Sequence, residues 1–311
     1  MAEKIATRQA YGETLVELGA ECPELVVMDA DLSGSTKTGM FAKAYPDRFF
    51  NMGIAEQGLY ATAAGIALSG KTVCASTFAM FATGRAYEII RNSIGYTKAN
   101  VKICATHAGI TVGEDGASHQ TFEDISLMRN IPGMTVLSPS DAVSARKLIR
   151  AAVNFDGPCY IRLGRAAVPI FYDDDVELEI GKANKLRDGN DVTIVATGIM
   201  VSEAMEAAER LAKDDIDARV IDIHTVKPID KEIIIEAAKE TGAIVTCEEH
   251  SVIGGLGSAV AEVVVKNAPV KMSFVGQQDT YGESGKPDEL KAKYGMNADA
   301  IVKAVKDICN K

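Results

Sequence analysis

Short apolar runs alternate with helix-patterned segments along this chain, and that alternation restricts its fold more than any other feature. Apolar or β-branched runs of roughly four to eight residues are typical of buried strands. In the first half of the chain they predict strands at 24–29, 49–52, 71–76, 101–105, 133–137 and 157–163. Helices are predicted at 7–18, 56–68, 78–94 and 141–153, the last with Ser140 as its N-cap. Strands that alternate with helices form a mostly parallel sheet covered on both faces, so we predict an α/β protein.

The alternation is interrupted once, at residues 168–190, where an acidic run replaces the apolar pattern. It then resumes with expected strands at 192–196, 218–223, 244–247 and 270–275, and helices at 202–212, 230–241, 257–267, 288–293 and 299–308. The 311 residues suffice for two separate cores. We therefore expect two open, mostly parallel α/β domains, at 1–167 and 191–311, with 168–190 as the linker.

Charge and cysteine content exclude several classes of function. The formal net charge is −10, with acidic residues spread along the chain, so no basic face is expected that could neutralise nucleic-acid phosphates. No uncharged run is long enough for a membrane span, and the charged beginning lacks the apolar region of a signal peptide. The six cysteines form no C-x-x-C pair and several lie in apolar runs, which predicts reduced thiols and a cytoplasmic protein.

The strand predicted at 101–105 leads into a polar loop, 106–120, with the sequence THAGITVGEDGASHQ. The loop holds two of the four histidines of the chain, His107 and His119, with Glu114 and Asp115 between them and three glycines. Open α/β sheets bind ligands beyond the carboxyl ends of their strands. Irregular loops of about this length are uncommon unless they are functional or disordered, so we predict an active-site loop.

The loop sequence ATHAGITVGEDGASHQ resembles the active-site loop of transketolases, and GIAEQ at 53–57 resembles the glutamate motif of the same family. The resemblance extends over essentially the whole chain but covers only the C-terminal half of the family's members. It implies a pyrimidine-binding domain followed by a transketolase C-terminal domain. It also implies the family's activity, the thiamine diphosphate-dependent transfer of a two-carbon ketol unit between sugar phosphates in the pentose phosphate pathway.

The resemblance assigns the cofactor contacts. Glu56 would hydrogen-bond the aminopyrimidine and activate the cofactor, Phe81 would stack on that ring with Phe78 in the same pocket, and Asp31 would lie near the ring linkage. From the local residues alone, Glu56 is equally explained as a capping glutamate and the phenylalanine pair as ordinary core. A helix N-terminus favours the Glu56 carboxylate and burial favours its neutral acid, and the sequence leaves this protonation state open.

The resemblance also assigns the substrate contacts. At the phosphate end of the sugar it places Arg8, Ser35, His107 and Arg165, and arginine suits this task because its guanidinium binds phosphate oxygens in pairs. Asp115 would accept a hydrogen bond from the C2 hydroxyl. His119 would reach the C1 hydroxyl and the carbonyl oxygen of the donor. Glu56, His107 and His119 are thus the candidate catalytic residues.

Complete transketolases carry a G-D-G segment that binds Mg²⁺ and the diphosphate, and this sequence has none. The chain therefore resembles the C-terminal subunit of a split transketolase and is expected to hold no metal itself. A partner, the N-terminal transketolase subunit, would supply the Mg²⁺ and diphosphate site in an α2β2 heterotetramer. The Ala- and Gly-rich helix at 56–68 is expected to lie at a subunit interface.

Two related thiamine enzymes remain alternatives. Deoxyxylulose phosphate synthase normally has an arginine where this chain has His107 and Ala108, and the β subunit of the 2-oxoacid dehydrogenase first component normally lacks GEDG-x-x-HQ. The segment EEHSVIGGLGSA at 248–259 nevertheless resembles both at least as well as it resembles long-chain transketolases. A third alternative is a non-catalytic subunit that has kept the fold. The same segment runs through glycines into a helix, where an anion could bind, but it lacks the spacing of a dinucleotide site.

Overall fold

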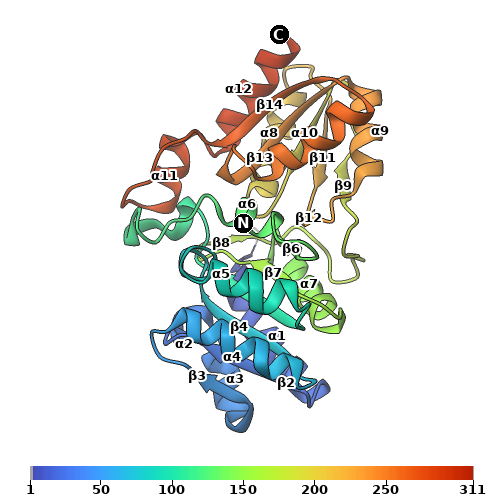
Figure 1. Ribbon diagram of the computed structural model, residues 1–311. Coiled ribbons are helices and arrows are strands. Elements are labelled where there is room, and N and C mark those ends of the chain that lie inside the picture. The colour runs from blue at the N-terminus through green and yellow to red at the C-terminus, as the bar shows by residue number, and fades with distance from the viewer. Residues whose placement is uncertain (1–2, 311) are drawn as a thin grey trace.

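The computed structural model describes residues 3–310, which form two α/β domains stacked end to end, with the second domain above the first in Figure 1. The sheet of the first domain has the strand order β12-β6-β7-β5-β4-β2-β3 and is parallel except for β12. Its strands are β2 (Leu25–Asp29), β3 (Phe49–Asn51), β4 (Thr72–Phe78), β5 (Val101–Thr106), β6 (Thr135–Leu137), β7 (Cys159–Arg162) and β12 (Thr225–Lys227).

Helices cover both faces of this sheet. One apolar core lies under α1 (Thr7–Glu21), α3 (Gly39–Ala44) and α7 (Ala142–Asn154). The other lies under α4 (Glu56–Leu68), the π-helical segments Phe81–Arg85 and Ile90–Tyr96 with α5 (Tyr87–Ile89) between them, and α6 (Asp124–Arg129). Three short helical turns complete the domain: α2 (Ser33–Thr36), Pro46–Arg48 and Ile110–Asp115.

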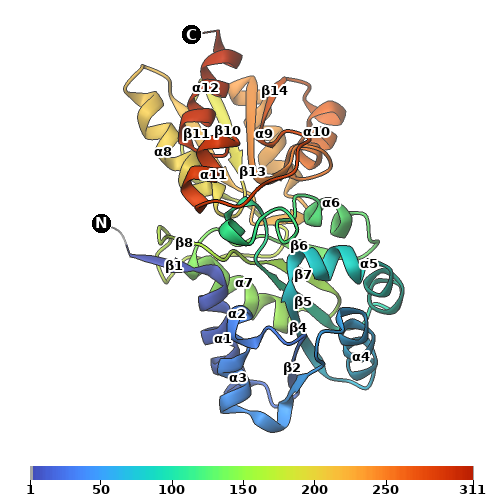
Figure 2. The ribbon, with the colours of Figure 1, turned by 90° about the vertical axis from the view of Figure 1, so that its left-hand side faces the viewer.

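The second domain repeats this plan on a smaller sheet with the order β14-β13-β10-β11-β9, parallel except for β9. Its strands are β9 (Asn184–Arg187), β10 (Val192–Ala196), β11 (Ala218–Asp222), β13 (Ala243–Ser251) and β14 (Lys271–Gln277). One core lies under α8 (Met200–Ala212) and α12 (Ala298–Cys309), and the other under α9 (Lys231–Thr241) and α10 (Leu256–Asn267). Helix α11 (Pro287–Lys293) lies beside the domain junction in Figure 2.

The fold class expected from the sequence, two mostly parallel α/β domains, is confirmed, and several details of the first domain differ. The helix predicted to start at Phe78 is wrong at its beginning, because β4 runs through Phe78 and the helical residues that follow are largely π-helical. Ser140 is not the N-cap of α7: Asp141 caps it, with its carboxylate accepting from Ser144 N at 2.7 Å. The loop after β5 contains a 3₁₀ turn.

The two domains are tied together at a sheet edge. Strand β12 belongs to the second half of the chain but pairs antiparallel with β6 of the first domain. Nearby, the Lys227 ammonium donates to the carbonyl oxygens of Arg129 and Ile131 at 2.7 and 2.6 Å. A two-stranded ribbon of β1 (Lys4–Ala6) and β8 (Ala167–Pro169) lies at the same junction. The boundaries expected at 167 and 190 stay a prediction.

The inner side of α4 lies on the sheet, and its outer side is exposed. Leu59, Tyr60 and Ala63 are buried, whereas Gly65 is exposed and nothing lies within 4 Å of the position a Cβ would take there. The small-residue face expected at a subunit interface is therefore open in the single chain. None of the helices within residues 3–310 combines the length and the apolar character that a membrane span needs.

Candidate functional site

Four rings meet at the edge of the first domain where β4 and β5 end. These strands are parallel neighbours with Phe78 opposite Thr106, so Phe78 and His107 emerge side by side. The two rings stack with centroids 3.9 Å apart. Phe81 stacks on Phe78 at 6.1 Å, and His119 approaches the Phe81 ring edge-on at 5.4 Å. The strand ends and the active-site loop thus bring together the four predicted ring residues.

His107 is held in one orientation and as a neutral ring. Its backbone has φ +59°, and its Nδ1 lies 2.9 Å from the Thr106 hydroxyl. Burial lowers the pKa of His107 to about 3, and the charges of Arg8 and Arg165 act in the same direction. Near neutral pH His107 is therefore an uncharged hydrogen-bonding group, with Nε2 directed to the Arg8 guanidinium 3.5 Å away.

Arg8 connects the rings to the polar loop after β2. Its Nη1 donates to the Ser35 carbonyl oxygen at 2.7 Å, so the contact uses the backbone of Ser35. The Arg8 Nε is buried and has no hydrogen-bond partner among the described residues. Burial and the neighbouring Arg165 charge both lower the pKa of Arg8. An unpartnered buried donor beside a second cation is an arrangement that an anion would satisfy.

Arg165 reaches the same region from the segment after β7. It donates to the Val112 carbonyl and to Glu114 Oε2, the latter at 2.7 Å, and so lies across the active-site loop. Glu114 offsets part of the Arg165 charge, but this pair is largely exposed and contributes little to stability. The predicted phosphate residues Arg8, Ser35, His107 and Arg165 therefore lie close together, with like charges facing one another.

Glu56 is the first residue of α4 and is buried, with 5% of its surface exposed. Its Oε2 lies 3.8 Å from Arg85 Nε, too far for a hydrogen bond, and Gln57 donates to the Arg85 carbonyl at 3.4 Å. Arg85 ends the π-helical turn that Phe81 begins, so these contacts link the start of α4 to the ring cluster. One helical turn on, the Tyr60 hydroxyl is buried and unpartnered among residues 3–310.

Asp31 and Asp115 lie on the exposed rim. Asp31 has φ +64° and exchanges hydrogen bonds with Asn51, whose amide donates to the Asp31 carboxylate at 3.1 Å. Asp115 ends the 3₁₀ turn of the loop and is exposed, and no hydrogen bond or ion pair joins it to the ring cluster within the described part of the chain. Both carboxylates are therefore accessible from outside the single chain.

The sequence reasoning missed the residue that shapes the loop around Ser35. Asp29, at the end of β2, is fully buried and accepts hydrogen bonds from Leu32 N at 2.6 Å and from the Thr36 and Thr38 hydroxyls at 2.6 and 2.8 Å. Burial raises the pKa of Asp29 against these hydrogen bonds. An acidic residue that ends an apolar strand before a Ser/Thr-rich loop was the available signal.

The glycine segment after β13 is not an open anion site. The Glu248 carboxylate accepts from Leu256 N at 2.6 Å and Gly257 N at 2.8 Å, so the chain's own acid occupies the N-terminus of α10. Among residues 3–310 no group of three or more His, Cys, Asp or Glu side chains could hold a metal ion. Cys22, Cys74, Cys104, Cys159 and Cys247 form no disulfide.

The fold and this edge define a class of protein: paired α/β domains that bring a buried acid, stacked rings and two arginines to one edge of a parallel sheet. The pyrimidine binding domain of transketolase matches residues 3–170, and the transketolase C-terminal domain matches residues 181–301. The chain belongs to the transketolase family, and membership implies thiamine diphosphate as the cofactor.

Two relatives and one solved structure place the chain within this family. A putative transketolase C-terminal section of Methanocaldococcus jannaschii is 52% identical over 96% of this chain and 94% of its own length. A solved split gene transketolase, described as an inactive beta4 tetramer, is 56% identical with a TM-score of 0.93, covering 98% of this chain and 99% of that one. Rat transketolase is 39% identical over the whole of this chain but over only 50% of its own length.

Proposed function

We propose that this chain is the C-terminal subunit of a split transketolase, which transfers a two-carbon ketol unit between sugar phosphates in the pentose phosphate pathway. One observation carries the proposal. The buried Glu56 carboxyl makes no hydrogen bond with any of residues 3–310 and is linked through Arg85 to the turn that begins with Phe81. Burying a carboxyl group costs free energy unless it is hydrogen-bonded or paired. An aminopyrimidine nitrogen is a chemically suitable hydrogen-bond partner.

The residues of this chain fit one end of the cofactor. When bound, thiamine diphosphate would supply a nucleophilic carbon and an acceptor for the electron pair released when the bond next to a ketose carbonyl breaks. Glu56 would hold the pyrimidine nitrogen by a hydrogen bond, and Phe81 would stack on the ring with Phe78 in the same pocket, a stacking contact worth about 1 kcal/mol beyond area burial. Asp31, on the rim, would lie near the ring linkage. The diphosphate and its Mg²⁺ belong to the N-terminal partner, because this sequence has no G-D-G segment.

The substrate roles follow from charge. Arg8, His107 and Arg165 bind the phosphate of the sugar, with Ser35 beside them. The two guanidiniums present donors, the neutral imidazole orients Arg8, and no acid within residues 3–310 forms an ion pair with Arg8. His119, next to Phe81, hydrogen-bonds the donor's C1 hydroxyl and carbonyl oxygen. Asp115 accepts from the C2 hydroxyl when the loop meets the substrate.

The active assembly is an α2β2 heterotetramer in the cytoplasm. Five cysteines, at 22, 74, 104, 159 and 247, form no disulfide, which favours a reducing compartment. The similar split gene transketolase described as an inactive beta4 tetramer is consistent with a chain that assembles but needs a partner to work. The open small-residue face of α4 suits close contact between subunits.

The decisive experiment is to copurify the chain with its N-terminal partner and assay ketol transfer with Mg²⁺ and thiamine diphosphate. The complex should be active and the chain alone inactive. Glu56→Gln should lower kcat by about 10²–10⁴-fold, whereas Glu88→Gln, which removes an exposed acid from α5, should have little effect. Unchanged turnover in Glu56→Gln would favour the non-catalytic alternative. Turnover of a 2-oxoacid or of glyceraldehyde phosphate with pyruvate would favour the related thiamine enzymes.

A further inference from the structure

Strand β13 of the second domain ends in three buried ionisable residues at the domain junction. Glu248, Glu249 and His250 are each at most 2% exposed. Successive side chains of a strand point to opposite faces, so the two glutamates serve different neighbours. Glu248 caps α10 within its own domain, whereas Glu249 is directed at the active-site loop of the first domain.

Glu249 contacts the active-site loop in two ways. Its Oε1 accepts a hydrogen bond from Thr111 N at 2.7 Å. Gly109, with φ +79°, lies so close that a Cβ there would approach the Glu249 carboxyl carbon to 2.2 Å. Only glycine meets both requirements, a positive φ and room for a carboxylate against the backbone. The loop is therefore shaped to fit the Glu249 side chain.

Arg162 holds Glu249 in place. This buried residue of β7 donates from Nη2 to the Glu249 carbonyl at 2.7 Å, and its Nη1 lies 3.5 Å from Glu249 Oε2. The same guanidinium donates from Nε to Asp124 Oδ2 at 2.7 Å. Asp124 begins α6, directly after the loop, and also accepts from the Tyr160 hydroxyl at 2.6 Å.

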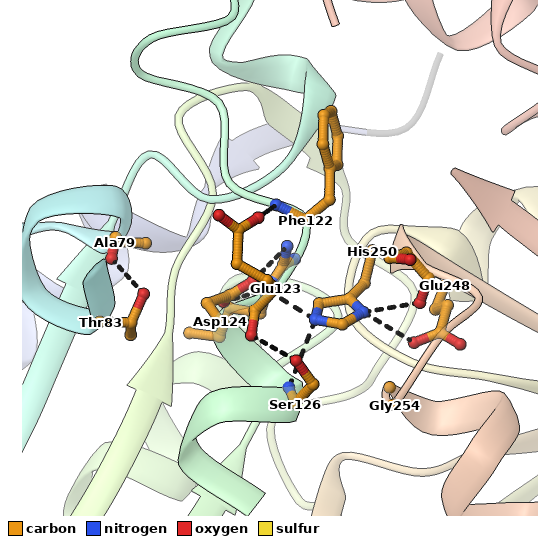
Figure 3. Close-up of polar contacts among 12 residues, drawn as sticks. Ala79, Thr83, Phe122, Glu123, Asp124, Ser126, Glu248, His250 and Gly254 are labelled. Atoms are coloured by element: carbon orange, nitrogen blue, oxygen red, sulfur yellow. Dashed lines mark hydrogen bonds and ion pairs between the residues drawn. The ribbon is translucent and has the colours of Figure 1, made fainter. Parts of the chain in front are cut away.

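The far end of the loop is fixed by the same strand. Ser251 N donates to the Phe122 carbonyl at 2.8 Å, and Ser126 N donates to His250 Nε2 at 3.4 Å. Figure 3 shows His250 between the start of α6 and Glu248, with Phe122 and Asp124 beside it. One strand of the second domain thus holds the loop both before and after the segment that carries His119.

We propose that Glu249 is a positioning residue for the active site: it fixes the backbone of the loop at Thr111 and so sets the placement of His107 and His119. Its consequence for catalysis rests on the proposed function, but its effect on the loop does not. The loop contains three glycines with positive φ, at 109, 113 and 116, and such backbone is flexible unless it is held. Without Glu249, the Thr111 N–H is left buried and unpaired.

The test compares Glu249→Ala and Glu249→Gln with Glu248→Gln, a neighbouring buried acid that does not touch the loop. Amide hydrogen exchange, followed by mass spectrometry on the chain alone, reports loop order without any assay of activity. Glu249→Ala should speed exchange in the peptide covering 107–120 by about tenfold, since it leaves the buried Thr111 N–H without its acceptor. Glu249→Gln keeps an oxygen acceptor and should stay within about threefold of the original. Glu248→Gln should speed exchange only at the start of α10.

A second pair of variants tests the close approach. Gly109→Ala should loosen the loop because its Cβ meets the Glu249 carboxyl, and it should loosen it less in the Glu249→Ala background, where that clash is absent.

In the assembled enzyme, Glu249→Ala should lower kcat/KM for a sugar phosphate by about tenfold, with Glu249→Gln restoring most of it.

Three results would overturn the proposal: loop exchange unchanged in Glu249→Ala, exchange faster in every peptide alike, or strictly additive effects of Gly109→Ala and Glu249→Ala. Loosening of the loop in an assembly without ketol transfer would instead retain the positioning role and reject the proposed function.

Discussion

Two polar clusters lie on either side of the active-site loop and differ in how their charges are matched. On one side, Arg8 and Arg165 face the neutral His107, and Arg8 Nε has no partner among the described residues. On the other, Arg162 is enclosed by the carboxylates of Asp124 and Glu249. The first cluster has excess positive charge at the molecular edge. The second holds its single cation between two carboxylates and is buried between the domains, and within residues 3–310 Glu249 Oε2 has no hydrogen-bond partner.

This difference distinguishes a cluster suited to binding a ligand from one suited to stabilising the fold. Burial by itself raises the pKa of Asp124, but the Arg162 and His250 contacts reverse this and lower it, so the acid is stabilised as an anion inside the protein. The pKa of Arg8 is lowered by burial and by Arg165, so keeping the Arg8 guanidinium charged costs free energy. A cluster that lowers its free energy by gaining an anion is suited to a ligand, and one that is already matched is suited to holding the fold.

The largest expected effect is the loss of stability when the cluster around Arg162 loses Asp124. Asp124→Ala removes the partner of a buried guanidinium and an acceptor of the Tyr160 hydroxyl, so the free energy of unfolding should fall by about 3–5 kcal/mol. Urea denaturation of the chain alone measures this. The control is Asp174→Ala, which removes an exposed partner of Arg146 and should change stability by less than about 1 kcal/mol. Equal losses in the two variants would mean that the junction is not a special cluster.

Arg8→Gln should show the opposite behaviour. The substitution removes a cation held against another cation, so the free energy of unfolding should change by less than about 1 kcal/mol. In the assembled enzyme KM for sugar phosphates should rise by about 10–100-fold with a smaller change in kcat, since a charged hydrogen bond to phosphate is worth about 1.5–3 kcal/mol. Arg146→Gln, at an exposed ion pair on α7, is the matched control. A large loss of stability without a change in KM would make Arg8 part of the architecture.

The cluster of Arg8, Arg165 and His107 was easier to predict from the sequence than the cluster around Arg162. Strands made of apolar runs, such as β2 and β10, could be predicted because apolar side chains themselves indicate burial. Strand β13 was predicted to end at Cys247, but it continues to Ser251 because Glu248, Glu249 and His250 are buried by partners from other segments. Periodicity carries no information about such partners.

The loop histidines and Glu56 could be proposed as site residues because each lies in a local motif, whereas the junction cluster is assembled from distant segments. Arg162 lies 38 positions from Asp124 and 87 from Glu249, so no spacing rule connects them. The pairing of β12 with β6 is hidden in the same way, because a strand of three residues gives too short a pattern to assign to a sheet. The available signal was three consecutive ionisable residues directly after an apolar strand.

A further expected effect, small for each pH unit, is a pH dependence that distinguishes the two clusters through their histidines. The pKa of His107 is lowered to about 3 by burial and then by Arg8 and Arg165, and the pKa of His250 is lowered to about 4 by burial against the opposing charge of Asp124. An ordinary histidine titrates near 6.5. Between the native pKa of each histidine and about 6.5, the unfolded chain binds a proton that the native chain does not. Each histidine therefore makes the free energy of unfolding rise as the pH rises to about 6.5, by at most about 1.4 kcal/mol per pH unit.

His107→Gln and His250→Gln should each flatten the dependence of unfolding free energy on pH between about 4 and 6.5. An anion should separate them. If the proposed function holds, a bound sugar phosphate places negative charge beside Arg8 and Arg165 and weakens the electrostatic effect that lowers the pKa of His107. The ligand should then narrow the difference in pH dependence between the original chain and His107→Gln. His250, enclosed at the junction, should not respond. Urea denaturation from pH 4.5 to 7.5, with and without sugar phosphate, measures both slopes, and an equal response of the two histidines would place the anion outside the Arg8 and His107 cluster.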